Sequence, residues 1–151
     1  MEVEGLDDEN HDQIRALILA GLRDRLGELD PALNRDLDDL RVSYGHGRTV
    51  AVRDDAGRIV GTGTLVPRGD ATAEIVRMSV AEAARRSGIG RLVVEDLLAT
   101  ARTWGTRRVV LETTSSWTGA IRFYQSCGFE ITHVEDDRFG SNTWFVRHLD
   151  G

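Results

Sequence analysis

The sequence predicts one α/β domain, residues 1–151, with a mixed, mostly antiparallel central sheet of six to seven strands flanked by about four helices. Three observations lead to this fold class. Apolar residues recur at helical spacing in some segments and form short strand-like runs in others. Turn-type sequences join the strands of the middle region, which indicates an antiparallel meander. A strand–helix–strand step over residues 72–113 indicates one parallel crossover.

The first part of the chain is expected to hold one short strand and two helices. Residues 2–5 fit the strand, and Asp8 is a suitable cap for the helix that follows. The apolar face of this helix comprises Ile14, Leu17, Ile18, Leu22 and Leu26. Asp30-Pro31 breaks the helix, and a second, weaker one is predicted over Ala32–Leu40. Its polar side is either a solvated face or the mouth of a site for a cationic substrate, and it carries Asp36, Asp38 and Asp39.

The middle of the chain predicts three consecutive strands and a long helix. The strands cover residues 48–53, 58–66 and 71–80. They are joined by turns at residues 54–57 and 67–70. The helix opens at Gly88 and ends near Trp104-Gly105.

A strand, a short helix and a hairpin complete the chain. Residues 108–113 are a compact apolar run, which is typical of a strand buried on both faces. The helix covers residues 117–127 and stops at Gly128, the residue type that favours a helix C-terminus. The final strands are expected at residues 129–134 and 142–148.

The composition is that of an acidic globular protein. Hydrophobic residues make up 40% of the chain and charged residues 29%, and the formal net charge is -6. This charge argues against general nucleic-acid binding and suits a cationic acceptor such as an amine. The N-terminus is not a signal peptide and no apolar run approaches the ~20 residues of a membrane helix, so we expect a cytoplasmic protein with no membrane partner. The single cysteine, Cys127, allows no internal disulfide, and the scattered histidines indicate no metal site.

The most informative segment runs from the strand end at Val80 to the helix that opens at Gly88. A helix start offers free backbone N–H groups and the positive end of the helix dipole, which suit a phosphate. Glycines at positions 88 and 90 let the backbone approach an anion, and positive charge comes from Arg85, Arg86 and Arg91. A simple strand-to-helix turn with solvated arginines is the alternative. P-loop and dinucleotide motifs fit poorly, because no lysine follows the glycines and the spacing is not G-x-G-x-x-G.

Two segments together resemble a known family. Arg85-x-x-Gly88-x-Gly90, placed after a strand that ends Arg77-Met78-Ser79-Val80, resembles the CoA-binding signature of the GNAT N-acetyltransferase superfamily. The segment Ala120–Phe129 resembles the second signature of that superfamily, at the matching separation. The resemblance implies a GNAT-like fold and acetyl-CoA as cosubstrate. It also implies transfer of the acetyl group to a primary amine of a small molecule or protein by direct attack in a ternary complex. A non-catalytic acyl-CoA sensor is the alternative, and a homodimer is compatible with the family.

The resemblance also implies which residues hold the cofactor. In the family, the strand before the phosphate loop splays from its neighbour and its backbone binds the pantetheine arm, here through Met78, Ser79 and Val80. The pyrophosphate would lie on Arg85, Arg86, Ser87, Gly88, Ile89, Gly90 and Arg91. Many family members carry an asparagine where this chain has Trp117, so Ser115 or Ser116 would supply the polar contact to the pantetheine arm.

This direction of the cofactor selects a catalytic carboxylate. With the pyrophosphate at Gly88–Gly90, the thioester should lie toward Val76, and Glu74 comes next along the strand. Strand alternation puts Glu74 on the same side as Val76, Met78 and Val80. An alkylamine has a pKa of about 10.4, so its attacking lone pair is rarely free at neutral pH and a base is needed.

The resemblance assigns the catalytic groups. Some family members carry their general base at the position matched by Glu74, which could otherwise only pair with Arg77 or another cation. Glu112 on the neighbouring strand is the reserve candidate. Tyr124 stands where the family places a tyrosine that donates a proton to the leaving sulfur, with a core tyrosine as the alternative. The backbone N–H of Met78 is suited to the developing oxyanion.

Overall fold

The computed structural model describes residues 1–26, 34–138 and 140–149. Within these ranges, one sheet contains β1 (Glu2–Gly5), β2 (Arg48–Arg53), β3 (Ile59–Gly69), β4 (Thr72–Val80), β5 (Arg108–Thr114), β6 (Glu130–Asp137) and β7 (Gly140–His148). The helices are α1 (His11–Leu26), η2 (Arg35–Leu37), α2 (Leu40–Tyr44), η3 (Glu82–Ala84), α3 (Ile89–Thr103) and α4 (Thr118–Ser126), of which η2 and η3 are short 3-10 helices. The predicted fold class is confirmed.

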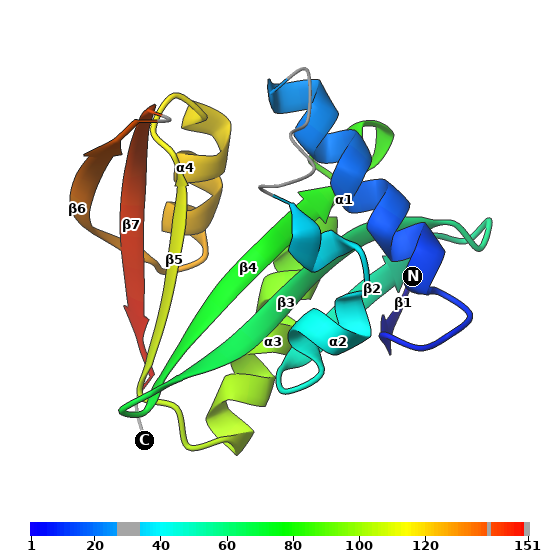
Figure 1. Ribbon diagram of the computed structural model, residues 1–151, viewed down its shortest axis with the longest axis horizontal. Helices are drawn as coiled ribbons and strands as arrows, with labels where there is room; N and C mark the ends of the chain where they lie inside the picture. The colour runs from blue at the N-terminus through cyan, green and yellow to red at the C-terminus, as the bar shows by residue number, and fades with distance from the viewer. Residues whose placement is uncertain (27–33, 139, 150–151) are drawn as a thin grey trace.

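The strands lie in the order β1-β2-β3-β4-β5-β7-β6 (Figure 1). Strands β4 and β5 are parallel, and α3 makes the crossover between them, as predicted. Every other neighbouring pair is antiparallel. The predicted hairpin at the end of the chain is present, with both of its strands longer than expected.

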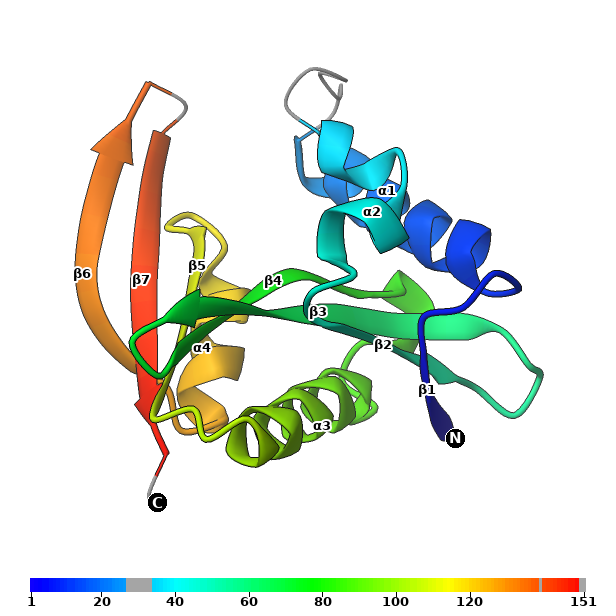
Figure 2. The same cartoon turned by 60° about the horizontal axis from the view of Figure 1, so that its bottom comes forward.

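Helices cover both faces of the sheet (Figure 2). Helix α3 packs on one face of β2, β3 and β4, and α1 packs on the opposite face of β3 and β4. The larger core lies on the α3 side and includes Val93, Leu97 and Phe145. The smaller core lies under α1, η2 and α2 and comprises Ile14, Ile18, Leu37, Leu40 and Ala51. Fully burying one such side chain contributes about 1.5–3 kcal/mol, so each cluster anchors its helices firmly to the sheet.

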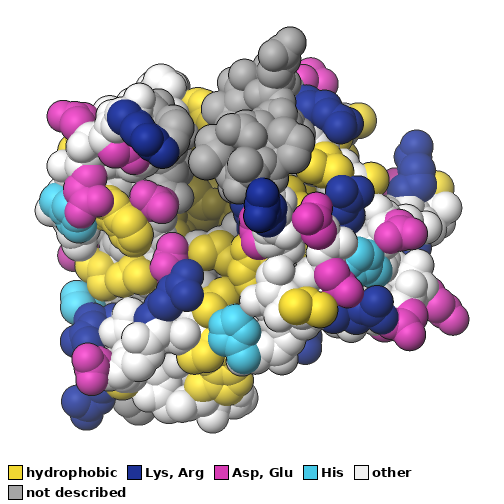
Figure 3. All heavy atoms as spheres, in the orientation of Figure 1, with side chains coloured by type: hydrophobic (Ala, Val, Ile, Leu, Met, Phe, Trp, Pro, Cys, Tyr) yellow, Lys and Arg dark blue, Asp and Glu magenta, His cyan; other side chains and the backbone are white. Residues whose placement is uncertain are grey.

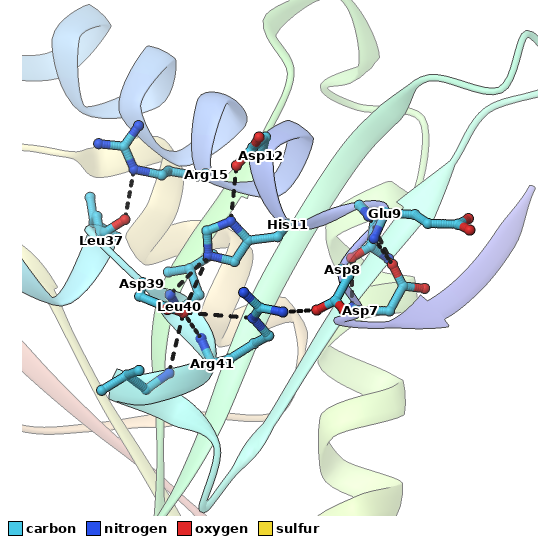
Figure 4. A network of polar contacts seen from close by, with 12 residues as sticks. Asp7, Asp8, Glu9, His11, Asp12, Arg15, Leu37, Asp39, Leu40 and Arg41 are labelled. Atoms are coloured by element: carbon cyan, nitrogen blue, oxygen red, sulfur yellow. Dashed lines mark hydrogen bonds and ion pairs between the residues drawn. The ribbon is translucent and has the colours of Figure 1, made fainter.

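Polar contacts also join α1 to η2 and α2 (Figure 4). His11 Nε2 accepts a hydrogen bond from the backbone N–H of Leu40 at 3.0 Å. Arg15 Nε donates to the backbone carbonyl of Leu37 at 2.7 Å. These bonds satisfy backbone groups at the ends of two short helices, where the helix itself offers no partner.

Asp39 explains why this region is not the single helix predicted over residues 32–40. Its backbone is extended, with φ of -145° and ψ of 105°, and its carboxylate accepts the amides of Arg41 and Val42. It therefore ends the turn of η2 and caps α2, which continues to Tyr44. No α-helix covers residues 34–39, where Arg35–Leu37 form a 3-10 helix instead, and only Leu40 is α-helical as predicted. Residues 32–33 lie outside the described part of the chain.

The predicted cap of the first helix was also misplaced. Asp7, and not Asp8, accepts the backbone amides of Glu9 and Asn10, at 2.9 and 2.8 Å. Asp8 instead forms an ion pair with Arg41 of α2 (Figure 4). Asp7 is further favoured as the cap because its own backbone N–H donates to Asn10 Oδ1 at 2.8 Å, so the two residues cap each other.

The turn predicted over residues 67–70 was wrong as well. Strand β3 continues through Pro67 and Arg68, and the turn consists of Asp70 and Ala71. Both turn residues have positive φ, 51° and 57°. A two-residue turn of this kind matches the twist of the flanking strands.

Strand β5 is buried on one face only, contrary to the prediction for residues 108–113. Val109 and Leu111 are buried on the side of α3 and α4, whereas Arg108 and Glu112 are exposed. The opposite side stays open because α1 and α2 lie over the other half of the sheet (Figure 1). The open face of β5 is one wall of the cleft described below.

A bulge in β4 changes the side-chain alternation that the sequence predicts. Thr62 pairs with Ser79 and Thr64 pairs with Val76, so the single residue Gly63 faces two residues, Arg77 and Met78.

Arg77 has a φ of 54°, which for a residue with a Cβ costs about 1–2 kcal/mol. Because of the extra residue, Met78 and Val80 pack with Ile75 on the α3 side. Glu74 lies on the other face, so the predicted shared side with Met78 and Val80 was wrong.

Gly63 gives a test of this packing. A Cβ at this position would lie 2.5 Å from Met78 Sδ and 2.8 Å from Val93 Cγ1. We expect Gly63→Ala to lower the free energy of unfolding by about 1–3 kcal/mol, because the bulge and α3 must move apart. Denaturant unfolding measures this change. Gly119→Ala on α4 is the matched control, since its Cβ would meet nothing within 4 Å, and it should leave the stability unchanged or slightly higher.

Candidate functional site

A cleft of about 980 Å³ opens where β4 and β5 separate. The two strands pair only from Thr72–Arg108 to Glu74–Val110 and then diverge, as Figure 1 shows. The cleft is lined by α1, α2, β4, the loop before α3, β5 and the start of α4. Figure 3 shows hydrophobic side chains within the hollow on this face.

No helix in the described residues has the length and apolar character to cross a bilayer.

One end of the cleft is the start of α3. Gly88 has a φ of 85° and no side chain caps this helix start, so the first N–H groups have no partner within the helix. A Cβ on Gly90 would lie 3.0 Å from Cζ of Phe123, whereas one on Gly88 would meet nothing within 4 Å. The backbone at this end is therefore bare on the cleft side and closely packed behind, which fits a phosphate group.

Arginines surround this helix start. Arg85, Arg86 and Arg91 all line the cleft. Arg85 Nη2 lies 3.5 Å from Asp24 Oδ2 of α1, and Arg91 Nη2 donates to the backbone carbonyl of Ser126 at 3.2 Å. These contacts hold the guanidinium groups near the uncapped amides, where they add to the positive helix dipole.

Three residues predicted to hold the cofactor do not line the cleft in the described part of the chain: Ser87, Ile89 and Ser116. The Ser87 hydroxyl donates to the Ala84 carbonyl, and the Ile89 side chain is only 2% exposed, in the core. The Ser116 carbonyl accepts the amide of Thr118 at 3.0 Å. The buried Ile89 can meet a ligand only through its backbone N–H group, whereas Ser87 is exposed.

The wall of the cleft is the edge of β4. Beyond Glu74, no other described strand pairs with the side of β4 that faces β5. The Ser79 hydroxyl turns away and donates to the Leu17 carbonyl at 3.2 Å. This edge can therefore offer its backbone groups to an extended ligand, and it lines the cleft at Met78, Ser79 and Val80.

Across from β4, the start of α4 contributes Trp117. It stands at the N-cap position, its carbonyl accepts the Ile121 amide at 3.1 Å, and it lines the cleft. Ser115 does not line the cleft, because its hydroxyl bonds to Ser141 and Thr143 of β7, at 3.0 and 2.9 Å. Trp117 thus presents a large side chain at the position where the resemblance predicts an asparagine.

Glu74 lies at the other end of the cleft. Its Oε1 accepts a hydrogen bond from Arg68 Nε at 2.9 Å, so its cationic partner is Arg68 and not Arg77. The Glu74 side chain is 14% exposed and that of Arg68 is 48% exposed. A carboxylate placed in this way can accept a proton or hold a cationic group.

Glu112 lies on β5, across the cleft from Glu74. Burial raises the pKa of its carboxyl above the usual value, and the negative charges of Glu74, Glu135 and Asp137 raise it further. This end of the cleft therefore has a negative potential, opposite in sign to the arginine-rich end.

Tyr124 is both a core residue and a cleft residue. It is 8% exposed, and its ring makes edge contacts with Phe123 and Phe129 at centroid distances of 5.1 and 6.1 Å. It also lines the cleft. Cys127, further along the chain, is buried, and burial raises the pKa of its thiol. This leaves Cys127 unsuited as a nucleophile.

Sequence reasoning missed a polar cluster beside the bulge, which we call the Arg77 clamp: Arg77, Asp36 and Tyr44. Arg77 Nε and Nη2 donate to the two carboxylate oxygens of Asp36 at 2.8 and 2.7 Å, and the Tyr44 hydroxyl also donates to Asp36. Burial raises the pKa of Asp36, but the hydrogen bonds from Arg77 and Tyr44 outweigh it and hold the pKa below the usual value. Burial and the Asp36 charge raise the pKa of Tyr44 to about 12. The run of acidic residues in the sequence was the only signal for this cluster.

The described residues hold no group of three or more His, Cys, Asp or Glu side chains arranged for a metal ion.

Comparison with known proteins supports one family. The family model of the acetyltransferase (GNAT) family matches residues 12–129. An uncharacterised N-acetyltransferase of Bacillus subtilis, YvbK, is 27% identical over 145 residues, which are 96% of this chain and 81% of that protein. Rat N-acetyltransferase 8 is 36% identical over 107 residues, 66% of this chain, and the aligned part is 48% of its length. The chain thus spans about half the length of that relative.

Solved structures show the same fold. An acetyltransferase of the GNAT family from Staphylococcus aureus superposes with a TM-score of 0.87 at 18% identity, covering 99% of both chains. A Bacillus subtilis acetyltransferase solved in complex with CoA gives a TM-score of 0.78 at 21% identity, covering 98% of both chains. From the family match over residues 12–129 and this common fold, the chain belongs to the acetyltransferase (GNAT) family.

Proposed function

We propose that this protein transfers the acetyl group of acetyl-CoA to a primary amine by direct attack in a ternary complex. The observation that carries the proposal is the geometry of β4. Its unpaired edge leads from the uncapped start of α3 to Glu74 within one cleft, which Tyr124 also lines. The donor site and a candidate base therefore lie along one strand.

The donor would bind in the direction set by the charges. Its pyrophosphate fits the amides of Gly88 to Arg91 and the arginines beside them. Its pantetheine arm, which carries amides, fits the free backbone edge of β4 as an added strand would. The structure of a relative bound to CoA, with the same fold, supports this assignment. The acetyl thioester would then lie near the bulge, between Met78 and Glu74.

The reaction needs the acceptor amine to lose a proton. The amine nitrogen forms a bond to the thioester carbon, and Glu74, directly or through water, takes the proton that the nitrogen loses. The backbone N–H of Met78 would donate to the oxygen on which negative charge develops. The carbon–sulfur bond then breaks, and Tyr124 donates a proton to the departing thiolate.

The acceptor that suits this end of the cleft is a cationic amine. Glu74 and Glu112 line it, and Glu135 and Asp137 add negative potential. Arg68 already occupies one side of Glu74, so an approaching ammonium group would take over part of that contact. Small-molecule amines and peptide amines both meet these requirements.

The central test is binding followed by turnover. Calorimetry with acetyl-CoA should give saturable binding, and a panel of amines should give amine-dependent release of CoA. Absence of acetyl-CoA binding would overturn the proposal. Binding with no turnover on any amine would instead favour a non-catalytic acyl-CoA sensor.

The base can be tested by Glu74→Gln. We expect kcat to fall about 100-fold near neutral pH, because the amide cannot accept the amine proton. The loss should shrink as the pH approaches the pKa of the amine, because free amine then no longer needs a base. Glu112→Gln is the matched control with the same chemical change on the facing strand. A larger loss of kcat in the control would make Glu112 the base.

The proton donor can be tested by Tyr124→Phe. A thiol of pKa about 8.5 leaves tolerably without protonation, so we expect kcat to fall only about tenfold. The ring packing against Phe123 and Phe129 should stay intact, so the melting temperature should hardly move. An unchanged kcat would return Tyr124 to a purely structural role.

The raised pKa of Glu112 predicts a pH-dependent stability. A group whose pKa is higher in the folded state stabilises the fold while protonated, and this contribution is lost as the pH rises through the folded pKa. Glu112→Gln should therefore raise the melting temperature at about pH 7 but not at about pH 3. The rise should be on the order of 1 °C, since solvent screens this partly exposed side chain. Thermal unfolding at the two pH values measures it, and a lower melting temperature at neutral pH would contradict the assignment.

A further inference from the structure

We propose that Asp36 is a positioning residue: through the Arg77 clamp it holds the β4 bulge in the conformation that binds the acetyl donor. This inference rests on the proposed function, because it assumes that the donor lies along β4. The clamp joins η2 and the end of α2 to the strand that forms the cleft wall.

The backbone of Arg77 has an unusual conformation. Its φ of 54° belongs to the left-handed region, which favours glycine, and it occurs opposite Gly63 at the point where the β3–β4 pairing shifts. Such a conformation persists only where surrounding contacts fix it. The side chain of Arg77 is the part that makes these contacts.

The ion pair between Arg77 and Asp36 is bidentate. Both Nε and Nη2 of Arg77 donate to Asp36, one to each carboxylate oxygen, so the pair fixes the orientation of the guanidinium plane as well as its position. The Tyr44 hydroxyl donates to the same carboxylate and so orients it from the α2 side. The side chains of Arg77 and Asp36 are 21% and 25% exposed, so solvent weakens the contact only in part.

The bulge lies between the two parts of β4 that the proposed reaction uses. On one side of it lie Met78 to Val80, the edge proposed for the pantetheine arm, and on the other lies Glu74. The extra residue turns Met78 toward α3 while Glu74 stays on the open face. If the bulge flattened into a regular strand, either Glu74 or Met78 would turn to the opposite side of the sheet. The distance between donor and base therefore depends on the bulge.

Both ends of the clamp face the cleft. Arg77 and Tyr44 both line it. Asp36 lies on η2, whose Leu37 is buried in the core under α1. The clamp thus fixes the strand proposed to bind the donor relative to a helical segment that is anchored in the core.

The experiment uses a glycine substitution to separate positioning from packing. Asp36→Asn removes the charge from the clamp with almost no change in shape. Arg77→Gly removes the side chain but supplies a residue that adopts positive φ without help. If Asp36 acts by holding Arg77, Asp36→Asn should have no further effect on acetyl-CoA binding in a protein that already carries Arg77→Gly.

We expect Asp36→Asn to raise the dissociation constant for acetyl-CoA about tenfold, measured by calorimetry. Arg77→Gly should bind within about threefold of wild type, and adding Asp36→Asn to it should cause no further loss. Asp38→Asn is the control, an exposed aspartate two positions along, and should bind like wild type. Wild-type affinity in Asp36→Asn, or the same tenfold loss in the Arg77→Gly background, would overturn the proposal.

A ligand-free measurement keeps this result separate from the proposed function. The rate of hydrogen–deuterium exchange over residues 75–80 should be higher in Asp36→Asn than in the wild type. In the double variant, the rate should be close to that of Arg77→Gly alone. Unchanged exchange in Asp36→Asn would overturn the clamp even if acetyl-CoA binds well. Failure of the wild-type protein to bind acetyl-CoA, with the exchange behaving as expected, would overturn the donor assignment while leaving the clamp in place.

Discussion

The separation of β4 from β5 is the constraint on which the rest of the site depends. The two strands share hydrogen bonds only as far as Glu74–Val110. Beyond that point β3 is the only described strand that pairs with β4, and the other edge of β4 would be costly to leave unsatisfied in a buried position. The cleft solves this, because it leaves the edge open to solvent or to a ligand. The large core under α3 holds β4 on one face, so the edge can be open without the strand losing its place.

Two local features then shape this edge. The uncapped start of α3 closes one end with backbone N–H groups, and the bulge at Arg77 changes which face each side chain takes. A regular strand would not contain the positive φ of Arg77, and a capped helix would not leave these N–H groups without a partner. Strain and unsatisfied groups of this kind concentrate where a protein binds or reacts. Here they occur within one strand and the loop that follows it.

The sequence predicted what short-range patterns control. Periodicity and turn residues located most helices and strands, and the two signature segments predicted the cleft end at Gly88. It could not predict contacts between distant segments: Arg77 and Asp36 are 41 residues apart, and their pairing follows from the way η2 packs over β4. The sequence could not predict the bulge, because arginine is not a residue type that favours positive φ.

The distribution of charge gives the site its polarity. The chain is acidic overall, with a net charge of -6, yet the arginines near α3 gather where a pyrophosphate would lie. The carboxylates lie at the far end, where a cationic amine would enter. Opposite potentials at the two ends would disfavour a donor bound in reverse and would keep an amine away from the arginine-rich end. Because one strand carries both ends, its bulge would set the spacing at which the proposed donor and acceptor meet.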